Sequence, residues 1–294
     1  MIDGVINVYK EKGFTSHDVV AKLRGILHMK KIGHTGTLDP DATGVLPVCL
    51  GKATKLCEMF TDRSKTYEAV MHLGIVTDTQ DITGKILEEH NVSIDDDRLL
   101  EVLEKFKGPI MQIPPMYSAL KVNGKKLYEY ARAGIEIERQ PRPIEIYQLE
   151  MGDREGSLVK LTVSCSKGTY IRTLCHDIGS KLGCGACMES LMRTRVGRFP
   201  ISEALTLSQI EQLRDEKMLE SKILPIEEVF CELPQVIVDK SYDHLVHNGN
   251  PLKVHEISAD IDTMIRLYDS KKEFIGIYKF EEKRNLWKPE KMFY

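Results

Sequence analysis

Hydrophobic and polar residues alternate in several short stretches of this chain, and that alternation is the period of a half-buried β-strand. In residues 64–74, every second side chain from Tyr67 to Leu73 is apolar. Residues 4–9, 45–50 and 158–165 show similar runs. The first two thirds of the chain are therefore expected to contain a sheet built from several strands.

Other stretches repeat their apolar residues every three or four positions, which is the period of an amphipathic helix. Thr15 and Asp18 form a capping-box pattern at the start of the first of these stretches. Helices are expected at residues 15–27, 93–107, 125–134 and 170–178, the last after a turn at 166–169, and two more are expected to begin at residues 51 and 206. A further helix after Cys184 would carry Leu191. Helices and strands thus follow one another along the chain, which predicts an α+β protein.

The pattern changes near residue 231, where a Cys-Glu-Leu-Pro segment follows an acidic stretch. Beyond it, residues 236–238, 264–268 and 274–278 have the character of short strands, and a polar turn lies at 248–251. We therefore expect two domains, at residues 1–230 and 231–294, of which the second is small and rich in β-structure.

The composition is that of a folded, soluble protein rather than of a disordered or membrane-spanning one. The chain has 294 residues, of which 42% are hydrophobic, enough for a substantial core. It has no apolar run of membrane-spanning length and begins on sequence typical of folded structure, so a soluble cytoplasmic protein is expected. Seven irregularly spaced cysteines indicate free thiols in a reducing compartment.

The net charge of −3 is unevenly distributed. Residues 201–294 carry 13 Lys and Arg against 18 Asp and Glu, while basic residues cluster locally in the first 200 positions. Binding of nucleic acid needs a local positive face rather than a positive protein. The charge therefore leaves an RNA-binding function open.

The strongest candidate for chemistry is the segment of residues 33–44, which contains three glycines and an Asp39-Pro40 pair. Pro40 restricts Asp39 to extended conformations, so the carboxylate stands on a stiffened loop among neutral hydroxyl groups. Such a carboxylate suits a nucleophile or an acid–base group. The alternative is a simple Asp-Pro turn.

The residues Gly33-His34-Thr35-Gly36-Thr37-Leu38-Asp39-Pro40 and Ala42-Thr43-Gly44-Val45-Leu46 resemble the signature of the TruB family of tRNA pseudouridine synthases. The resemblance implies that Asp39 is catalytic and that uridine-55 in the T-loop of tRNA is the substrate. It also implies the pseudouridine synthase fold, a mixed and largely antiparallel sheet with flanking helices, followed by a PUA-like domain. Because uridine and pseudouridine are isomers, no cofactor is expected.

Further segments resemble the family in the same order. The resemblance implies that Tyr67 stacks on the target base, that Arg172 pairs with Asp39 and keeps it ionised, and that Leu191 packs against the uracil. His34 is expected to enter the tRNA loop that the flipped base vacates. The family usually has two arginines where this chain has Met192-Arg193. The predicted substrate- and RNA-binding residues are His34, Lys55, Asp81, Lys121, Lys125, Lys126, Tyr170 and Leu191.

Segment 109–134 is rich in proline near position 115 and then interleaves lysines with Tyr128 and Tyr130. Basic and aromatic residues together are typical of nucleic-acid contacts. The segment also resembles the family's tRNA-gripping element, so we expect it to bind the T-arm. The alternative is a surface loop without a partner.

Two other classes of function remain open from the sequence. One is a tRNA-folding chaperone or RNA-binding module without catalysis. The other is a zinc-dependent nucleic-acid enzyme that would use Cys184 and Cys187, although a lone CxxC pair supplies too few ligands. RNA-guided relatives share the Asp39 loop, but the compact length and the absence of basic tails favour a stand-alone enzyme. A monomer that binds neither metal nor membrane is also expected.

Overall fold

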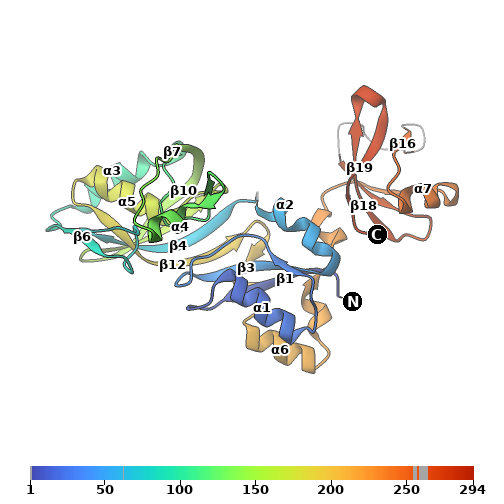
Figure 1. Cartoon of the computed structure of the whole chain (residues 1–294), viewed down its shortest axis with the longest axis horizontal. Coiled ribbons are helices and arrows are strands. Elements are labelled where there is room, and N and C mark those ends of the chain that lie inside the picture. Colours follow the sequence, from blue (N-terminus) through green and yellow to red (C-terminus); the bar gives the residue numbers. More distant parts are fainter. Residues whose placement is uncertain (1, 62, 254–256, 258–263) are drawn as a thin grey trace.

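The computed structural model describes residues 2–61, 63–253, 257 and 264–294. Its main feature is a ten-stranded sheet in the order β14-β1-β3-β12-β4-β11-β10-β7, with β2 paired to β3 and β13 paired to β12 (Figure 1). The strands are β1 (Gly4–Lys10), β2 (Ile32–His34), β3 (Thr43–Leu50), β4 (Lys65–Leu73), β7 (Gly108–Gln112), β10 (Arg142–Glu155), β11 (Leu158–Cys165), β12 (Ala186–Val196), β13 (Phe199–Pro200) and β14 (Ile223–Leu224). Only the β3–β12 pair in this sheet is parallel, so the expected mixed, largely antiparallel sheet is confirmed.

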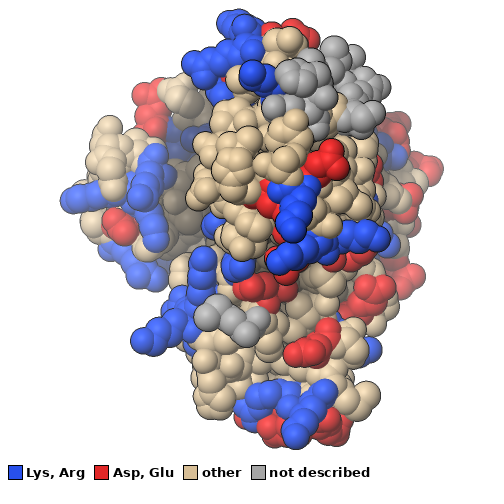
Figure 2. Space-filling model, turned by 90° about the vertical axis from the view of Figure 1, so that its right-hand side faces the viewer, with Lys and Arg blue, Asp and Glu red and all other residues tan. Residues whose placement is uncertain are grey.

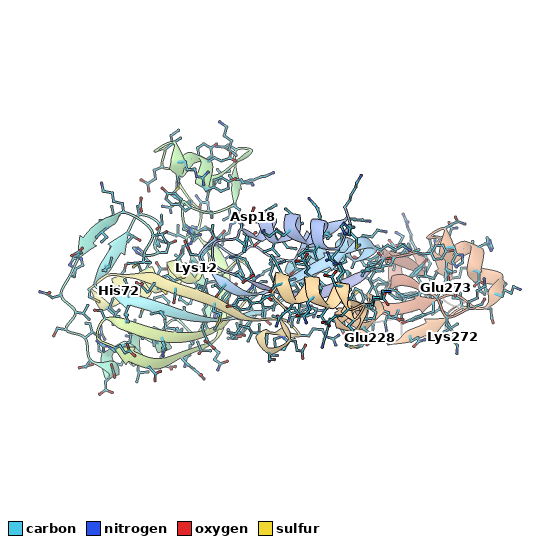
Figure 3. All side chains as sticks on the ribbon, turned by 90° about the horizontal axis from the view of Figure 1, so that it is seen from below. Lys12, Asp18, His72, Glu228, Lys272 and Glu273 are labelled. Carbon is cyan, nitrogen blue, oxygen red and sulfur yellow. The ribbon has the colours of Figure 1, made fainter. Side chains whose placement is uncertain are left out.

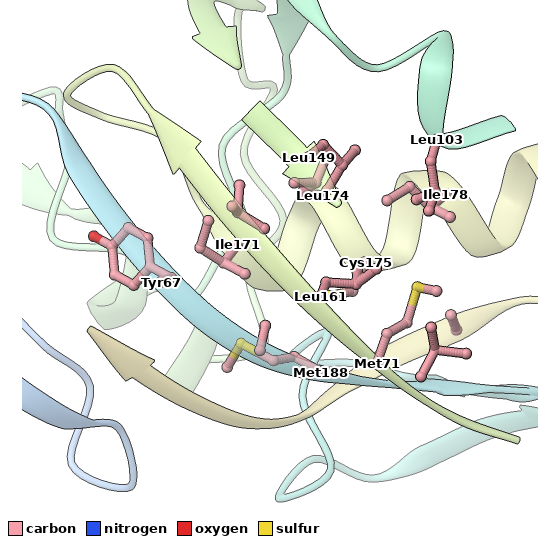
Figure 4. Close-up of a cluster of buried hydrophobic side chains, with 14 of the residues drawn as sticks. Tyr67, Met71, Leu103, Leu149, Leu161, Ile171, Leu174, Cys175, Ile178 and Met188 are labelled. Carbon is pink, nitrogen blue, oxygen red and sulfur yellow. The ribbon is translucent and has the colours of Figure 1, made fainter. Parts of the chain in front are cut away.

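Strands β4 and β12 run through the middle of the molecule and join its two halves (Figure 1). In one half, α3 (Asp96–Glu104) and α5 (Ile171–Leu182) cover the sheet; in the other half lie α1 (Ser16–Ile26) and α6 (Leu207–Asp215). The core under α5 joins Leu174 and Ile178 to Leu161 of β11 and Met71 of β4 (Figure 4). A second core lies under α1.

Local sequence accounts for how the two longest helices begin or end. Thr15 caps α1: its hydroxyl accepts a hydrogen bond from the N–H of Asp18, and its own N–H donates to the Asp18 carboxylate, as the capping-box pattern predicts. Helix α5 ends at Gly183, whose φ of 81° lies in the left-handed region that favours glycine. The chain then turns directly into β12, so the predicted helix carrying Leu191 is wrong. Leu191 lies on a strand opposite Ala69 of β4.

Segment 109–134 projects from the body and has more regular structure than its prolines suggest. Its first residues belong to β7, and a hairpin of β8 (Lys121–Val122) and β9 (Lys125–Lys126) leads into α4 (Leu127–Arg132). The helix therefore begins two residues later than expected. Figure 3 shows this green segment standing on the side of the body that carries Asp18 and Lys12.

The short helix α2 (Cys57–Thr61) precedes β4 in the chain. A second hairpin, of β5 (Ile75–Thr77) and β6 (Ile86–Glu89), follows β4. The C-terminal part forms a five-stranded sheet in the order β15-β17-β18-β19-β16, with helix α7 (Asp243–His247). Its strands are β15 (Gln235–Ile237), β16 (Leu252–Lys253), β17 (Met264–Tyr268), β18 (Phe274–Glu281) and β19 (Leu286–Met292). Its core is built around Trp287 and Tyr278, and the expected β-rich C-terminal module is confirmed.

Candidate active site

Asp39 lies on the loop between β2 and β3, at the edge of a cleft of about 860 Å³. Its side chain is 44% exposed, so a substrate can reach the carboxylate. Residues from the loop, from β4, from β12, from the start of α5 and from segment 109–134 all line the cleft. The volume suits one nucleotide, since ligand sites typically measure about 300–1,000 Å³.

Side chains of β1 and of the start of α1 hold the Asp39 loop in place by hydrogen bonds to its backbone. Lys10 is fully buried, and its Nζ donates hydrogen bonds to the carbonyl oxygens of Pro40 at 3.0 Å and Ala42 at 2.6 Å. Burial lowers the pKa of Lys10 to about 8, against the opposing pull of the carboxylates Asp39 and Asp41. On the other side of Asp39, the N–H of Leu38 donates to the Ser16 hydroxyl at 2.9 Å.

Arg193 of β12 holds the other end of the same loop. Its side chain is buried, with Nε donating to the carbonyl of Val45 at 2.7 Å and the two terminal nitrogens to Thr37 at 3.5 Å and Gly36 at 3.4 Å. Gly44 has a φ of 103°, and a side chain there would lie 2.2 Å from the Arg193 carbonyl. Glycine is therefore required where β3 passes β12.

Arg172, in the first turn of α5, joins three parts of the cleft. Its Nη2 lies 3.3 Å from the Asp39 carboxylate and donates to the carbonyl of Tyr117 at 2.8 Å. Its Nη1 lies 3.6 Å from Asp81, whose carboxylate also accepts hydrogen bonds from Thr83. The guanidinium is buried whereas Asp39 is partly exposed, so the ion pair lies where the protein interior meets the open cleft.

Tyr67, Tyr170 and Leu191 line the same cleft. Tyr67 is 7% exposed; burial raises the pKa of its phenol, which contacts Arg193. Tyr170 is fixed at the start of α5 because Gln112 both donates to its carbonyl and accepts from its N–H, at 3.1 and 2.9 Å. The structure thus brings Asp39 together with Tyr67, Tyr170, Arg172, Leu191 and Asp81.

Five residues predicted to bind RNA do not line this cleft: His34, Lys55, Lys121, Lys125 and Lys126. The His34 ring instead packs edge-on against His17, 5.1 Å away, and burial lowers its pKa. Lys55 donates to the carbonyl of Met292 at 2.7 Å, which ties the body to the C-terminal module. The three remaining lysines lie on the β8–β9 hairpin, where Nζ of Lys126 lies 5.3 Å from the Tyr128 ring.

Several residues that line the cleft were not among the predicted site residues: Lys12, Lys65, Tyr117, Ser118, Arg132 and Arg193. Arg132 was detectable, because it lies one helical turn after Tyr128 and its guanidinium lies 5.3 Å from that ring. Arg193 was noted only as half of an incomplete arginine pair. Its contacts with main-chain carbonyls leave no local pattern in the sequence.

Cys184 and Cys187 are both buried, and burial raises the pKa of each thiol, to about 11 at Cys187. Among residues 2–61, 63–253, 257 and 264–294, no three His, Cys, Asp or Glu side chains are grouped closely enough to hold a metal ion. No helix in the described part of the chain is long and apolar enough to cross a membrane.

Comparison with known proteins adds independent information. Residues 24–171 match the TruB family pseudouridylate synthase N-terminal domain, and residues 172–230 match the tRNA pseudouridylate synthase B C-terminal domain. A protein named tRNA pseudouridine synthase B from Lachnoclostridium phytofermentans is 52% identical, covering 99% of this chain and 100% of the relative. One of the same name from Listeria welshimeri is 47% identical, covering 99% and 98%.

Solved structures show the same fold. The protein in "Crystal Structure of a Cbf5-Nop10-Gar1 Complex" aligns with a TM-score of 0.76 and 31% identity, covering 99% of this chain and 85% of that one. The protein in "Structure of H/ACA RNP bound to a substrate RNA containing 2'-deoxyuridine" aligns with a TM-score of 0.74 and 29% identity, with the same coverage. The family models, the curated relatives and the fold agree, and this chain belongs to the TruB family of pseudouridylate synthases.

Proposed function

We propose that this protein isomerises uridine to pseudouridine in tRNA, with uridine-55 of the T-loop as its target and Asp39 as the essential carboxylate. The observation that carries the proposal is the arrangement around Asp39. A carboxylate with an exposed face lies 3.3 Å from the buried Arg172 guanidinium, in a cleft that also holds Tyr67 and Leu191. The relatives named tRNA pseudouridine synthase B support tRNA as the substrate.

The reaction breaks the bond between N1 of uracil and the ribose, turns the base and joins C5 to the same ribose carbon. The proton on C5 is lost and N1 gains one, so atoms balance without a cofactor. Asp39 can assist either by adding to the ring or by acting at the ribose carbon. Both routes use the carboxylate, and the Arg172 guanidinium 3.3 Å away pairs with it.

The target base must leave its stack before Asp39 can reach it, which costs a few kcal/mol. Stacking on an aromatic ring returns about 1–3 kcal/mol per base. Tyr67 offers such a ring in the cleft, and Leu191 an apolar side chain. The cleft therefore has the groups needed to hold a flipped uridine beside Asp39.

Recognition of the T-arm would come from the positive surfaces around the cleft. Figure 2 shows Lys and Arg side chains on the lobe that stands apart from the body and across the hollow that separates them. In this proposal, Lys121, Lys125 and Lys126 contact phosphates at the edge of the RNA, and residues 231–294 act as a PUA-like RNA-binding domain. Residues 1–230 form the catalytic domain, and the enzyme acts as a monomer.

A stand-alone enzyme is favoured over an RNA-guided one. Identity is 52% to a tRNA pseudouridine synthase B and 31% to the protein of the Cbf5 complex. The test is to incubate the purified protein alone with unmodified tRNA and to map pseudouridine at single-nucleotide resolution. We expect modification of the T-loop uridine without any added RNA or protein. Binding and refolding of tRNA without pseudouridine would instead establish the chaperone alternative.

A further inference from the structure

The cleft contains a hydroxyl group that the proposed mechanism does not use. Ser118 lines the cleft but is only 4% exposed. Its Oγ has no hydrogen-bond partner among the residues that the structure describes. A buried polar atom left unpaired costs about 1–3 kcal/mol, so such atoms in folded proteins call for an explanation.

The backbone that carries this hydroxyl is firmly anchored. The N–H of Ser118 donates to the carbonyl of Met116 at 2.9 Å, and its carbonyl accepts from the N–H of Tyr128 at 3.1 Å. The preceding carbonyl, of Tyr117, accepts from Arg172 at 2.8 Å. Ser118 is thus tied to the same guanidinium that pairs with Asp39, and the hydroxyl has a defined place relative to the carboxylate.

The neighbouring side chain of Tyr170 does not satisfy the Ser118 hydroxyl. Burial raises the pKa of Tyr170, and its contact with Ser118 opposes that rise, yet the Ser118 Oγ lacks a partner within hydrogen-bond geometry. A hydroxyl that is buried, rigidly held and unpaired at a binding cleft is prepared for a ligand atom. Uracil presents two carbonyl oxygens and one N–H on its polar edge, so donors are the groups it needs most.

We propose that the Ser118 hydroxyl donates a hydrogen bond to a carbonyl oxygen of the flipped uracil and so helps to select and position the base. This inference rests on the function proposed above. It makes Ser118 a specificity-determining residue contributed by segment 109–134. Segment 109–134 would then contact the flipped base through Ser118 as well as the RNA phosphates through its lysines.

The test compares Ser118→Ala with Ser93→Ala, which removes a hydroxyl from an exposed residue outside the cleft. Ser118→Ala should lower kcat/KM on tRNA by about 5- to 150-fold, the cost of leaving one buried hydrogen-bond group unpaired. Its melting temperature should stay the same or rise, because the orphaned hydroxyl is gone. Ser93→Ala should behave as the wild type in both respects.

A substrate analogue separates a direct contact from a structural effect. tRNA is prepared with uridine, 2-thiouridine or 4-thiouridine at the target, since sulfur is a weak hydrogen-bond acceptor. With one of the two thio-substrates, the wild type should be several-fold slower than with uridine. Ser118→Ala, which already lacks the hydrogen bond, should react with that thio-substrate at nearly its own rate on uridine. Equal losses for both enzymes on both analogues, or an unchanged kcat/KM for Ser118→Ala, would overturn the inference. A wild type that forms no pseudouridine would instead overturn the proposed function.

Discussion

Replacing Arg193 tests whether the Asp39 loop is held by tertiary hydrogen bonds. Arg193→Met keeps most of the length and the apolar contacts of the side chain but removes the charge and all donors. The bond to Val45 at 2.7 Å is charge-assisted, and such bonds contribute about 1.5–3 kcal/mol. The bonds to Gly36 and Thr37 are long, at 3.4 and 3.5 Å, and together add about 1 kcal/mol at most.

The free energy of unfolding should therefore fall by about 2–4 kcal/mol in urea titrations. Because the loop carries Asp39, single-turnover pseudouridine formation should also fall, by roughly 100-fold for a displacement near 1 Å, at a temperature where the variant is folded. Arg195→Met is the matched control, since Arg195 lies on the same strand but is exposed. Wild-type rates in folded Arg193→Met would refute the idea that Arg193 positions the loop.

Three further predictions follow from individual side chains. Replacing Lys125 and Lys126 by Gln should reduce the slope of log affinity for tRNA against log salt by roughly 0.7–0.9 per lost phosphate contact; an unchanged slope would show that they contact only solvent. The pKa of Lys10 is about 8 in the folded protein, against its ordinary value of 10.5 in the unfolded chain. Between these two pH values the unfolded state therefore binds more protons than the folded state. Stability should rise with pH across that window, by at most about 1.4 kcal/mol per pH unit, and Lys10→Met should abolish the rise relative to wild type. Elemental analysis should find no stoichiometric zinc, and Cys184→Ser with Cys187→Ser should leave activity intact; one tightly bound zinc per chain, with activity lost on chelation, would contradict this.

The sequence predicted those strands whose inner faces are continuously apolar. β1, β3, β4 and β11 are inner strands of the large sheet, and burial imposes a clear pattern on them. β10 was not predicted although it has 14 residues, because most of its side chains are exposed and its alternation is interrupted by bulges. β12 was mistaken for a helix in part because a register shift near Ser190 breaks its period of two.

The candidate site was predicted where a local motif carries the information. Asp39, Tyr67 and Arg172 come from three separate segments, and each was assigned through its own resemblance to the family. The supporting groups Lys10 and Arg193 act on main-chain carbonyls, which any residue could provide, so no sequence pattern marks them. The lysines predicted to bind RNA lie outside the cleft, because their charge indicates affinity for phosphate but not the direction of the side chain, and their contacts with RNA stay a prediction.

The central claim is that Asp39 performs the isomerisation. Asp39→Asn keeps the size of the side chain and much of its hydrogen bonding but removes the charge that pairs with Arg172. The direct measurement is single-turnover formation of pseudouridine in tRNA, with binding of the same tRNA measured in parallel. We predict that Asp39→Asn binds tRNA as the wild type does and forms no pseudouridine. A rate of one tenth of wild type or more would contradict the assignment.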